Sequence, residues 1–210
     1  MGDAYSFDPV VLGDRECDAW VHYYRREWVA FLRDSLGLVS AGFGMGPRRT
    51  VAGAWLVLRA NQVWAPYPDN DPDGARELMR RFYALVVADG KIDLDPAEAA
   101  RREVHWWHVH RVHQRENGVT EASLVDAVAD LYAYVYTVPG TTIREAARLR
   151  VAAMDLSDAW VAAGCSLSEP TLVEERRALI ASYSALRAAI DTAGVTGTRH
   201  ASASRQVRPD

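Results

Sequence analysis

The sequence contains very little lysine and cysteine. Lys91 is the only lysine among 24 basic side chains, so nearly all positive charge comes from arginine. This bias is typical of a GC-rich genome, as in actinobacteria, and it reflects origin rather than chemistry. The two cysteines, Cys17 and Cys165, are far apart and have neither a metal-binding nor a redox spacing. Such sparse cysteine predicts a reduced, cytoplasmic protein.

The sequence also lacks a long apolar run and an excess of basic charge. Its uncharged stretches between Ser35 and Tyr67 are shorter than the roughly 20 residues that cross a bilayer. The N-terminus has neither the charged nor the apolar region of a signal peptide. The net charge of −4 disfavours a nucleic-acid binder, because duplex affinity depends on basic side chains that neutralise phosphates. We therefore expect no transmembrane segment and no nucleic-acid partner.

The common metal and nucleotide signatures are missing as well. The sequence has no His-Glu-x-x-His motif and no Cys/His array that could bind zinc. A ferritin-like di-iron site needs Glu-x-x-His on two helices, but Glu103 is followed three residues later by Trp106, and Glu145 by Arg148. The glycines of residues 42–46 have neither a preceding strand nor the lysine of a phosphate-binding loop. The sequence therefore identifies no cofactor.

The chain does contain a series of helix-sized segments separated by proline and glycine. Apolar residues recur every three or four positions, and no segment alternates with period two beside a hairpin turn. We predict an all-α protein, a single-domain helical bundle of about seven helices over residues 1–193. Residues 194–210 are small, polar and weakly basic, and we expect them to form a disordered tail. The predicted helices span residues 14–38, 47–64, 71–88, 95–117, 120–136, 142–164 and 168–193.

Several of these segments begin with a side chain that can cap a helix. We expect Asp14, Asp71, Asp95 and Thr120 to be N-caps, because each can accept a hydrogen bond from a free backbone N–H of the first turn. Residues 142–145 have the spacing of a capping box. On the first helix, Glu16 could pair with an arginine or contribute to a site.

The most unusual segment is residues 103–114, which holds four of the six histidines and two of the seven tryptophans. At about 100° per residue, His105 and His108 lie on the solvated side of the helix. The opposite, aromatic face carries Glu103, Trp106, Trp107, His110 and Gln114. Polar groups on an aromatic face need partners, since an unsatisfied buried group costs about 1–3 kcal/mol. This face therefore predicts a polar pocket lined by tryptophan.

Two interpretations of this face remain open. In one, Glu103 and His110 are a catalytic acid–base pair, and His110 could bind a metal together with His113, three residues away. In the other, both side chains find structural partners across the bundle. Arg150, on the inner face of its own helix, is one such partner and a candidate ligand-binding residue, as are Trp106, Trp107 and Gln114.

The region between residues 35 and 67 is almost uncharged and rich in large apolar side chains. It could line an apolar ligand site that includes Trp55, lie on a membrane surface, or form a helix buried at the centre of the bundle. Neither this region nor residues 103–114 carries a motif from which a known activity can be transferred.

Binding is the function that requires the fewest residues beyond those that the sequence shows. We expect a helical binding or interaction protein with an aromatic-rich pocket for an apolar small molecule or a partner helix. The alternative is an enzyme, oxidoreductase-like and iron- or haem-dependent, in which Glu103 and His110 act on an apolar substrate. A third interpretation is a homo-oligomer whose surplus aromatic side chains fill a subunit interface.

Overall fold

The computed structural model describes residues 6–90, 92–115 and 119–205, with side chains described up to residue 194. Within these ranges the chain is helical and contains no strand, which confirms the all-α prediction. None of the helices is long and apolar enough to span a bilayer. The eight helices of the described residues are α1 (Pro9–Tyr24), α2 (Trp28–Phe43), α3 (Pro47–Trp64), α4 (Pro72–Ala88), α5 (Pro96–Arg115), α6 (Glu121–Tyr136), α7 (Gly140–Ala162) and α8 (Thr171–Arg205).

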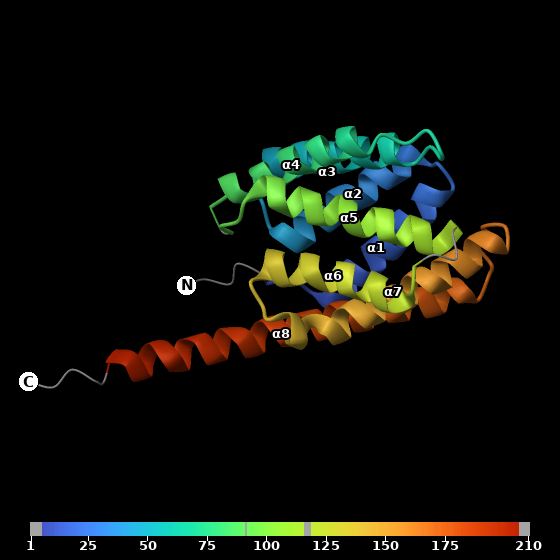
Figure 1. The fold of residues 1–210 in the computed structure, drawn as a ribbon. Coiled ribbons are helices and arrows are strands. Elements are labelled where there is room, and N and C mark those ends of the chain that lie inside the picture. The colour runs from blue at the N-terminus through green and yellow to red at the C-terminus, as the bar shows by residue number, and fades with distance from the viewer. Residues whose placement is uncertain (1–5, 91, 116–118, 206–210) are drawn as a thin grey trace, which may run out of the picture.

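The helices form a closed ring. Each helix packs against the next one in the chain, and α8 returns to pack against α1 (Figure 1). The ring has a continuous apolar interior to which almost every helix contributes buried side chains. The last turns of α8 extend beyond the other helices (Figure 1). The closed ring gives the molecule an interior, and the candidate site lies inside it.

Proline and an N-terminal cap define where most helices begin. Asp8, Asp71 and Asp95 each precede a proline, and each side chain accepts a backbone N–H two or three residues further on. Thr120 accepts the backbone N–H of Ser123 in the same way. The missing N–H of proline costs nothing in the first helical turn, so the Asp-Pro pair is well suited to start a helix. The expected caps at Asp71, Asp95 and Thr120 are confirmed.

The single helix predicted over residues 14–38 is wrong. The chain forms α1 and α2 instead, separated by a break at residues 25–27, where Arg26 has the left-handed φ of 60°. Asp14 is not a cap, because α1 begins one and a half turns earlier at Asp8 and Pro9. The break contains neither glycine nor proline. The three- and four-residue spacing of apolar side chains continues across it, which is why sequence periodicity concealed the break.

Two further helix ends differ from the prediction. The capping box at residues 142–145 is wrong, because α7 already begins at Gly140 after Pro139 and has no side-chain cap. Glu145 instead pairs with Arg148, one turn further on. The tail expected from residue 194 overlaps the last turns of α8, which continue to Arg205, and residues 206–210 lie outside the described ranges. The predicted end of the helix over residues 95–117 also lies outside them.

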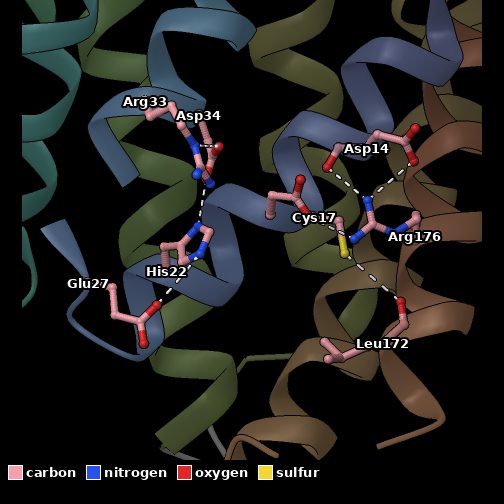
Figure 2. A network of polar contacts seen from close by, with 9 residues as sticks. Asp14, Cys17, His22, Glu27, Arg33, Asp34, Leu172 and Arg176 are labelled. Carbon is pink, nitrogen blue, oxygen red and sulfur yellow. Dashed lines mark hydrogen bonds and ion pairs between the residues drawn. The ribbon is translucent and has the colours of Figure 1, made fainter. Parts of the chain in front are cut away.

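Polar contacts hold α1 between its two neighbours (Figure 2). On the α2 side, His22 Nδ1 lies 2.6 Å from Oδ2 of Asp34, whose side chain is fully buried. On the α8 side, Arg176 donates to Asp14, and the Cys17 thiol points at a backbone carbonyl of α8 (Figure 2). These contacts fix the position of α1, which supplies one wall of the site.

Close helix packing completes the ring between α1 and α8. A Cβ atom on Gly13 would lie 2.7 Å from the backbone nitrogen of Ile180, well inside van der Waals contact. Glycine therefore lets the two backbones approach at this point. The approach brings Tyr183 of α8 to Glu16 of α1, where their side chains form a hydrogen bond of 2.7 Å.

Candidate functional site

The ring encloses a cavity of about 210 Å³, here called the inner cavity. All eight helices contribute to its wall, and none of the residues that line it is exposed. The wall is largely apolar and aromatic. Its members include Leu12, Val39, Met79, Val128 and Tyr136. Such a space resembles the apolar pockets in which proteins bury small organic molecules.

A buried ion pair lies in the wall of the inner cavity. The guanidinium of Arg150 donates two parallel hydrogen bonds to Glu16, of 2.8 and 2.5 Å, and a third of 3.0 Å to the Tyr132 hydroxyl. Burial opposes the charged guanidinium, but Glu16, together with Tyr132 and Tyr183, raises the pKa of Arg150 well above its ordinary value. Burial also raises the pKa of Tyr132 to about 12. The ion pair is therefore complete within the fold.

Aromatic rings surround the guanidinium of Arg150. Its central carbon lies 5.6 Å from the Trp20 ring, 5.3 Å from the Trp106 ring and 5.8 Å from the Tyr132 ring. A planar, weakly hydrated guanidinium suits such surroundings better than the ammonium of lysine would.

Glu103 fixes the two tryptophans that divide the interior. Its Oε1 atom accepts hydrogen bonds of 3.1 Å from the indole nitrogens of both Trp106 and Trp107, and Oε2 accepts one of 2.8 Å from Tyr83. The two indole rings meet edge to face, with an interplanar angle of 88°. Burial raises the pKa of Glu103, while its three donors act in the opposite direction. Glu103 thus positions the tryptophan rings.

A second cavity of about 290 Å³, here called the outer cavity, lies on the other side of these rings. Two of its lining residues, Arg26 and Arg115, are exposed, so the outer cavity reaches the surface. Five residues line both cavities and form the partition between them: Trp20, Phe31, Asn61, Trp106 and Trp107. The interior therefore consists of a largely apolar cavity without exposed lining residues next to a cavity that reaches the surface.

The outer cavity is lined by three arginines, Arg26, Arg111 and Arg115. None of them has a carboxylate within 4.0 Å in the part of the chain that the structure describes. The half-buried Arg111 donates a hydrogen bond of 2.8 Å to the Trp64 carbonyl and lies over the Trp64 ring at 4.5 Å. Burial, with the neighbouring charge of Arg115, lowers the pKa of Arg111 although Tyr23 opposes this. Arg111 is thus charged, partly desolvated and not neutralised by a carboxylate of the described residues.

His110 and Gln114 also line the outer cavity, and both bind the same aspartate of α7. His110 Nε2 lies 3.2 Å from Asp158, and Gln114 donates a hydrogen bond of 2.6 Å to it. His113 instead lies 3.3 Å from Asp155, and its other ring nitrogen faces the Val119 carbonyl. The two histidines thus turn to different aspartates. No group of three or more histidine, cysteine or acidic side chains among the described residues is arranged to hold a metal ion.

The structure gathers most of the predicted site residues but divides them between the cavities. Glu103 and Arg150 line the inner cavity, His110 and Gln114 line the outer cavity, and the two tryptophans line both. No hydrogen bond joins Glu103 to His110 or to Arg150 in the described chain. Metal binding by His110 and His113 stays a prediction. His105 and His108 are exposed, as the helical projection predicts.

Trp55 does not belong to this site. Its side chain is 53% exposed and lines neither cavity. Its neighbours in the sequence, Gly53 and Ala54, are buried, so Trp55 lies on the outer face of α3. Val51, one turn earlier on the same face, is also exposed. Binding of a partner or a membrane surface to this face stays a prediction.

The main residues that sequence reasoning missed are the arginines of the outer cavity. Arg111 follows Trp107 by four residues, so its position on the aromatic face of α5 was visible in the sequence. Arg26 lies in the break between α1 and α2, which periodicity did not reveal. Glu16 was expected to pair with an arginine, but its partner Arg150 is 134 residues away in the chain.

Behind the outer cavity lies a buried carboxyl group that has no hydrogen-bond partner in the described part of the chain. Glu175 of α8 is fully buried, and neither of its oxygens is hydrogen-bonded among the described residues. Its polar neighbours are Cys17 and Ser157, of which Ser157 lines the outer cavity. Burial raises the pKa of Glu175 to about 7. Unlike Glu16, this carboxyl group forms no ion pair among the described residues, although the charge of Arg176 acts to lower its pKa.

The fold and the cavities define an all-α protein whose closed ring of helices surrounds an aromatic interior. No protein-family model, curated protein or solved structure matches the chain. What the protein does is therefore inferred from the shape and chemistry of the two cavities.

Proposed function

We propose that this protein binds an apolar small molecule inside its ring of helices. The observation that carries this proposal is the inner cavity of about 210 Å³, which is enclosed by apolar and aromatic side chains from all eight helices. Apolar cavities of about 150 Å³ already accept a molecule the size of benzene. The inner cavity has room for a somewhat larger one, and a longer molecule could continue past the tryptophan partition into the outer cavity.

The polar groups of the interior support binding rather than catalysis. Glu16 and Arg150 neutralise one another, and Glu103 already accepts three hydrogen bonds. The enzymatic alternative requires Glu103 and His110 to act on one substrate, yet they line different cavities and have separate hydrogen-bond partners. A binding role needs no group beyond those that the interior contains.

The shape of the interior favours a small molecule over a partner helix. A helix that binds in a groove needs a long apolar surface open to solvent. The residues that line the inner cavity are all buried or partly buried, and only the outer cavity has exposed lining residues. A small molecule can enter such a space after a modest opening of the outer cavity, whereas a helix would have to separate the ring.

Tryptophan fluorescence can test this proposal directly, because Trp20, Trp106 and Trp107 line both cavities. Titration with decanol should change the emission saturably, with one molecule bound per chain. The variant Ala19→Phe places a ring in the inner cavity and should abolish the change. Ala122→Phe, at an exposed position of α6, is the matched control and should bind like the wild type. A non-saturable response, or undiminished binding by a folded Ala19→Phe variant, contradicts the proposal.

A further inference from the structure

The three arginines of the outer cavity are gathered at one end of α3. Arg111 and Arg115 lie on successive turns of α5, and their guanidinium carbons are 5.7 and 4.5 Å from the centre of the same Tyr67 ring. Arg26 approaches from the break between α1 and α2 and donates a hydrogen bond of 3.1 Å to the Ala65 carbonyl. Two chain segments, α5 and the break between α1 and α2, thus bring three positive charges to the outer cavity.

The described residues do not balance the local charge at this point. Other arginines, such as Arg150 and Arg176, each have a carboxylate within hydrogen-bond distance, whereas these three have none among the described residues. Two of them donate to carbonyls at the C-terminal end of α3, where the helix dipole contributes only about half a negative charge. Asp158, which lies beside the cavity residue His110, already accepts a hydrogen bond from Gln114.

The arginines and the apolar space lie on the two sides of one partition. The outer cavity that they line shares its tryptophan wall with the inner cavity. A molecule whose apolar end occupies the inner cavity and crosses this partition would therefore present its other end to the arginines. A guanidinium recognises a carboxylate in particular, because its planar fork matches the two oxygens.

We propose that the natural ligand is an amphipathic organic anion, with an apolar body in the inner cavity and an anionic head bound by Arg26, Arg111 and Arg115. This inference rests on the proposed binding function and specifies the chemical class of its ligand. The whole chain carries a net charge of −4, so a preference for an anion must come from this local cluster. Arg111 is the central contact, because it is half-buried between Trp64 and the cavity.

Three probes with the same ten-carbon chain and different heads test the inference: decanoate, decanol and decylammonium. Each is titrated into the full-length protein below its micelle-forming concentration, and tryptophan emission is followed. Decanoate should bind on the order of tenfold more tightly than decanol, and decylammonium more weakly than decanol. Added salt should weaken the binding of decanoate and leave that of decanol unchanged.

Arginine variants locate the head group. Arg111→Met and Arg115→Met should each remove most of the advantage of decanoate over decanol, while decanol binds as before. Arg115 is exposed and lies over the Tyr67 ring, so Arg115→Met remains informative even if Arg111→Met does not fold. Arg81→Met removes the same charge from an exposed position of α4 and is the matched control.

The outcomes separate the two proposals. If decanoate and decanol bind equally, or decylammonium binds most tightly, the proposed preference for an anionic head is wrong. The proposed binding function is unaffected by that result. Saturable binding of none of the probes contradicts both proposals. A preference for decanoate that persists in both arginine variants also overturns the inference, because the anion would then be recognised elsewhere.

Discussion

Two arginines inside the same ring of helices have opposite electrostatic surroundings. Arg150 and Arg111 both lie against tryptophan rings, 5.3 Å from Trp106 and 4.5 Å from Trp64 respectively. Arg150 has Glu16 as a bidentate partner, and its pKa is raised well above the ordinary value. Arg111 has only carbonyl and hydroxyl partners among the described residues, and burial lowers its pKa.

The comparison distinguishes two kinds of arginine. Arg150 is neutralised by Glu16 and stabilises the fold, whereas the charge of Arg111 is available to a ligand. The inner ion pair is complete, so it shapes the cavity without requiring an additional ion. The outer cluster keeps an excess of positive charge next to an open space, which is the arrangement expected of an anion site. The comparison can be tested by changing one region at a time.

The largest effect is expected from Arg150→Met. Removing the cation leaves Glu16 buried without a counter-charge, and broken buried ion pairs cost about 3–5 kcal/mol. Urea unfolding should show a loss of this size in the free energy of unfolding. The double variant Glu16→Gln/Arg150→Met should recover a large part of it. A loss below about 1 kcal/mol in the single variant would mean that the pair does not stabilise the fold.

Glu175, a buried carboxyl group that forms no ion pair among the described residues, should instead destabilise the fold when it is charged. Burial raises the pKa of Glu175 from 4.5 to about 7, so between these values the folded chain keeps a proton that the unfolded chain has lost. The stability of the wild type should therefore fall as pH rises from 4.5 to about 7 and then level off, at a total cost of about 3 kcal/mol.

The variant Glu175→Gln should not lose this free energy of unfolding as the pH rises. It should match the wild type near pH 4.5 and exceed it by about 3 kcal/mol at pH 8, as measured by urea unfolding at each pH. Glu174→Gln, at the adjacent exposed position, is the control and should follow the wild type. Parallel curves for wild type and Glu175→Gln across this range would show that the carboxyl group is not held in its neutral form.

The closure of the ring near Glu16 can be disturbed without changing any charge. Gly13→Ala would place a Cβ atom 2.7 Å from the backbone of Ile180, and overpacking of this kind costs about 1–3 kcal/mol. Gly140→Ala, where a Cβ meets no atom within 4 Å, should be neutral or slightly stabilising. Thermal unfolding compares the two variants. An unchanged melting temperature for Gly13→Ala would show that α1 and α8 can separate freely.

The smallest effect on stability is expected from Arg111→Met. The variant loses hydrogen bonds to backbone carbonyls and the contact with Trp64, but it leaves no opposite charge unpaired among the described residues. We expect a cost of about 1 kcal/mol in urea unfolding, well below that of Arg150→Met. Equal losses of unfolding free energy in Arg111→Met and Arg150→Met would contradict the distinction between a paired inner arginine and an outer one that is unpaired among the described residues.

The sequence was sufficient to predict features that depend on local patterns. These include the all-α class, the Asp-Pro starts of α4 and α5, and the face of α5 that carries Glu103 and Trp107. Helical periodicity and caps involve residues within a few positions of one another, so a single sequence reveals them.

Features that depend on distant contacts were not predictable. Glu16 and Arg150 are far apart in the chain, and only the closure of α8 on α1 and α7 brings them together. The break at residues 25–27 has no glycine or proline to mark it, so the position of Arg26 could not be foreseen. The outer arginine cluster combines that break with one face of α5 and was therefore missed.

The most direct test of the account is a crystal structure with decanoate that carries bromine on its terminal carbon. Anomalous scattering would locate the bromine, and the electron density would locate the carboxylate. The account predicts bromine in the inner cavity, near Leu12 and Val128, and the carboxylate within hydrogen-bond distance of Arg111. Bromine outside the ring, for example on the exposed face of α3 at Trp55, would contradict it.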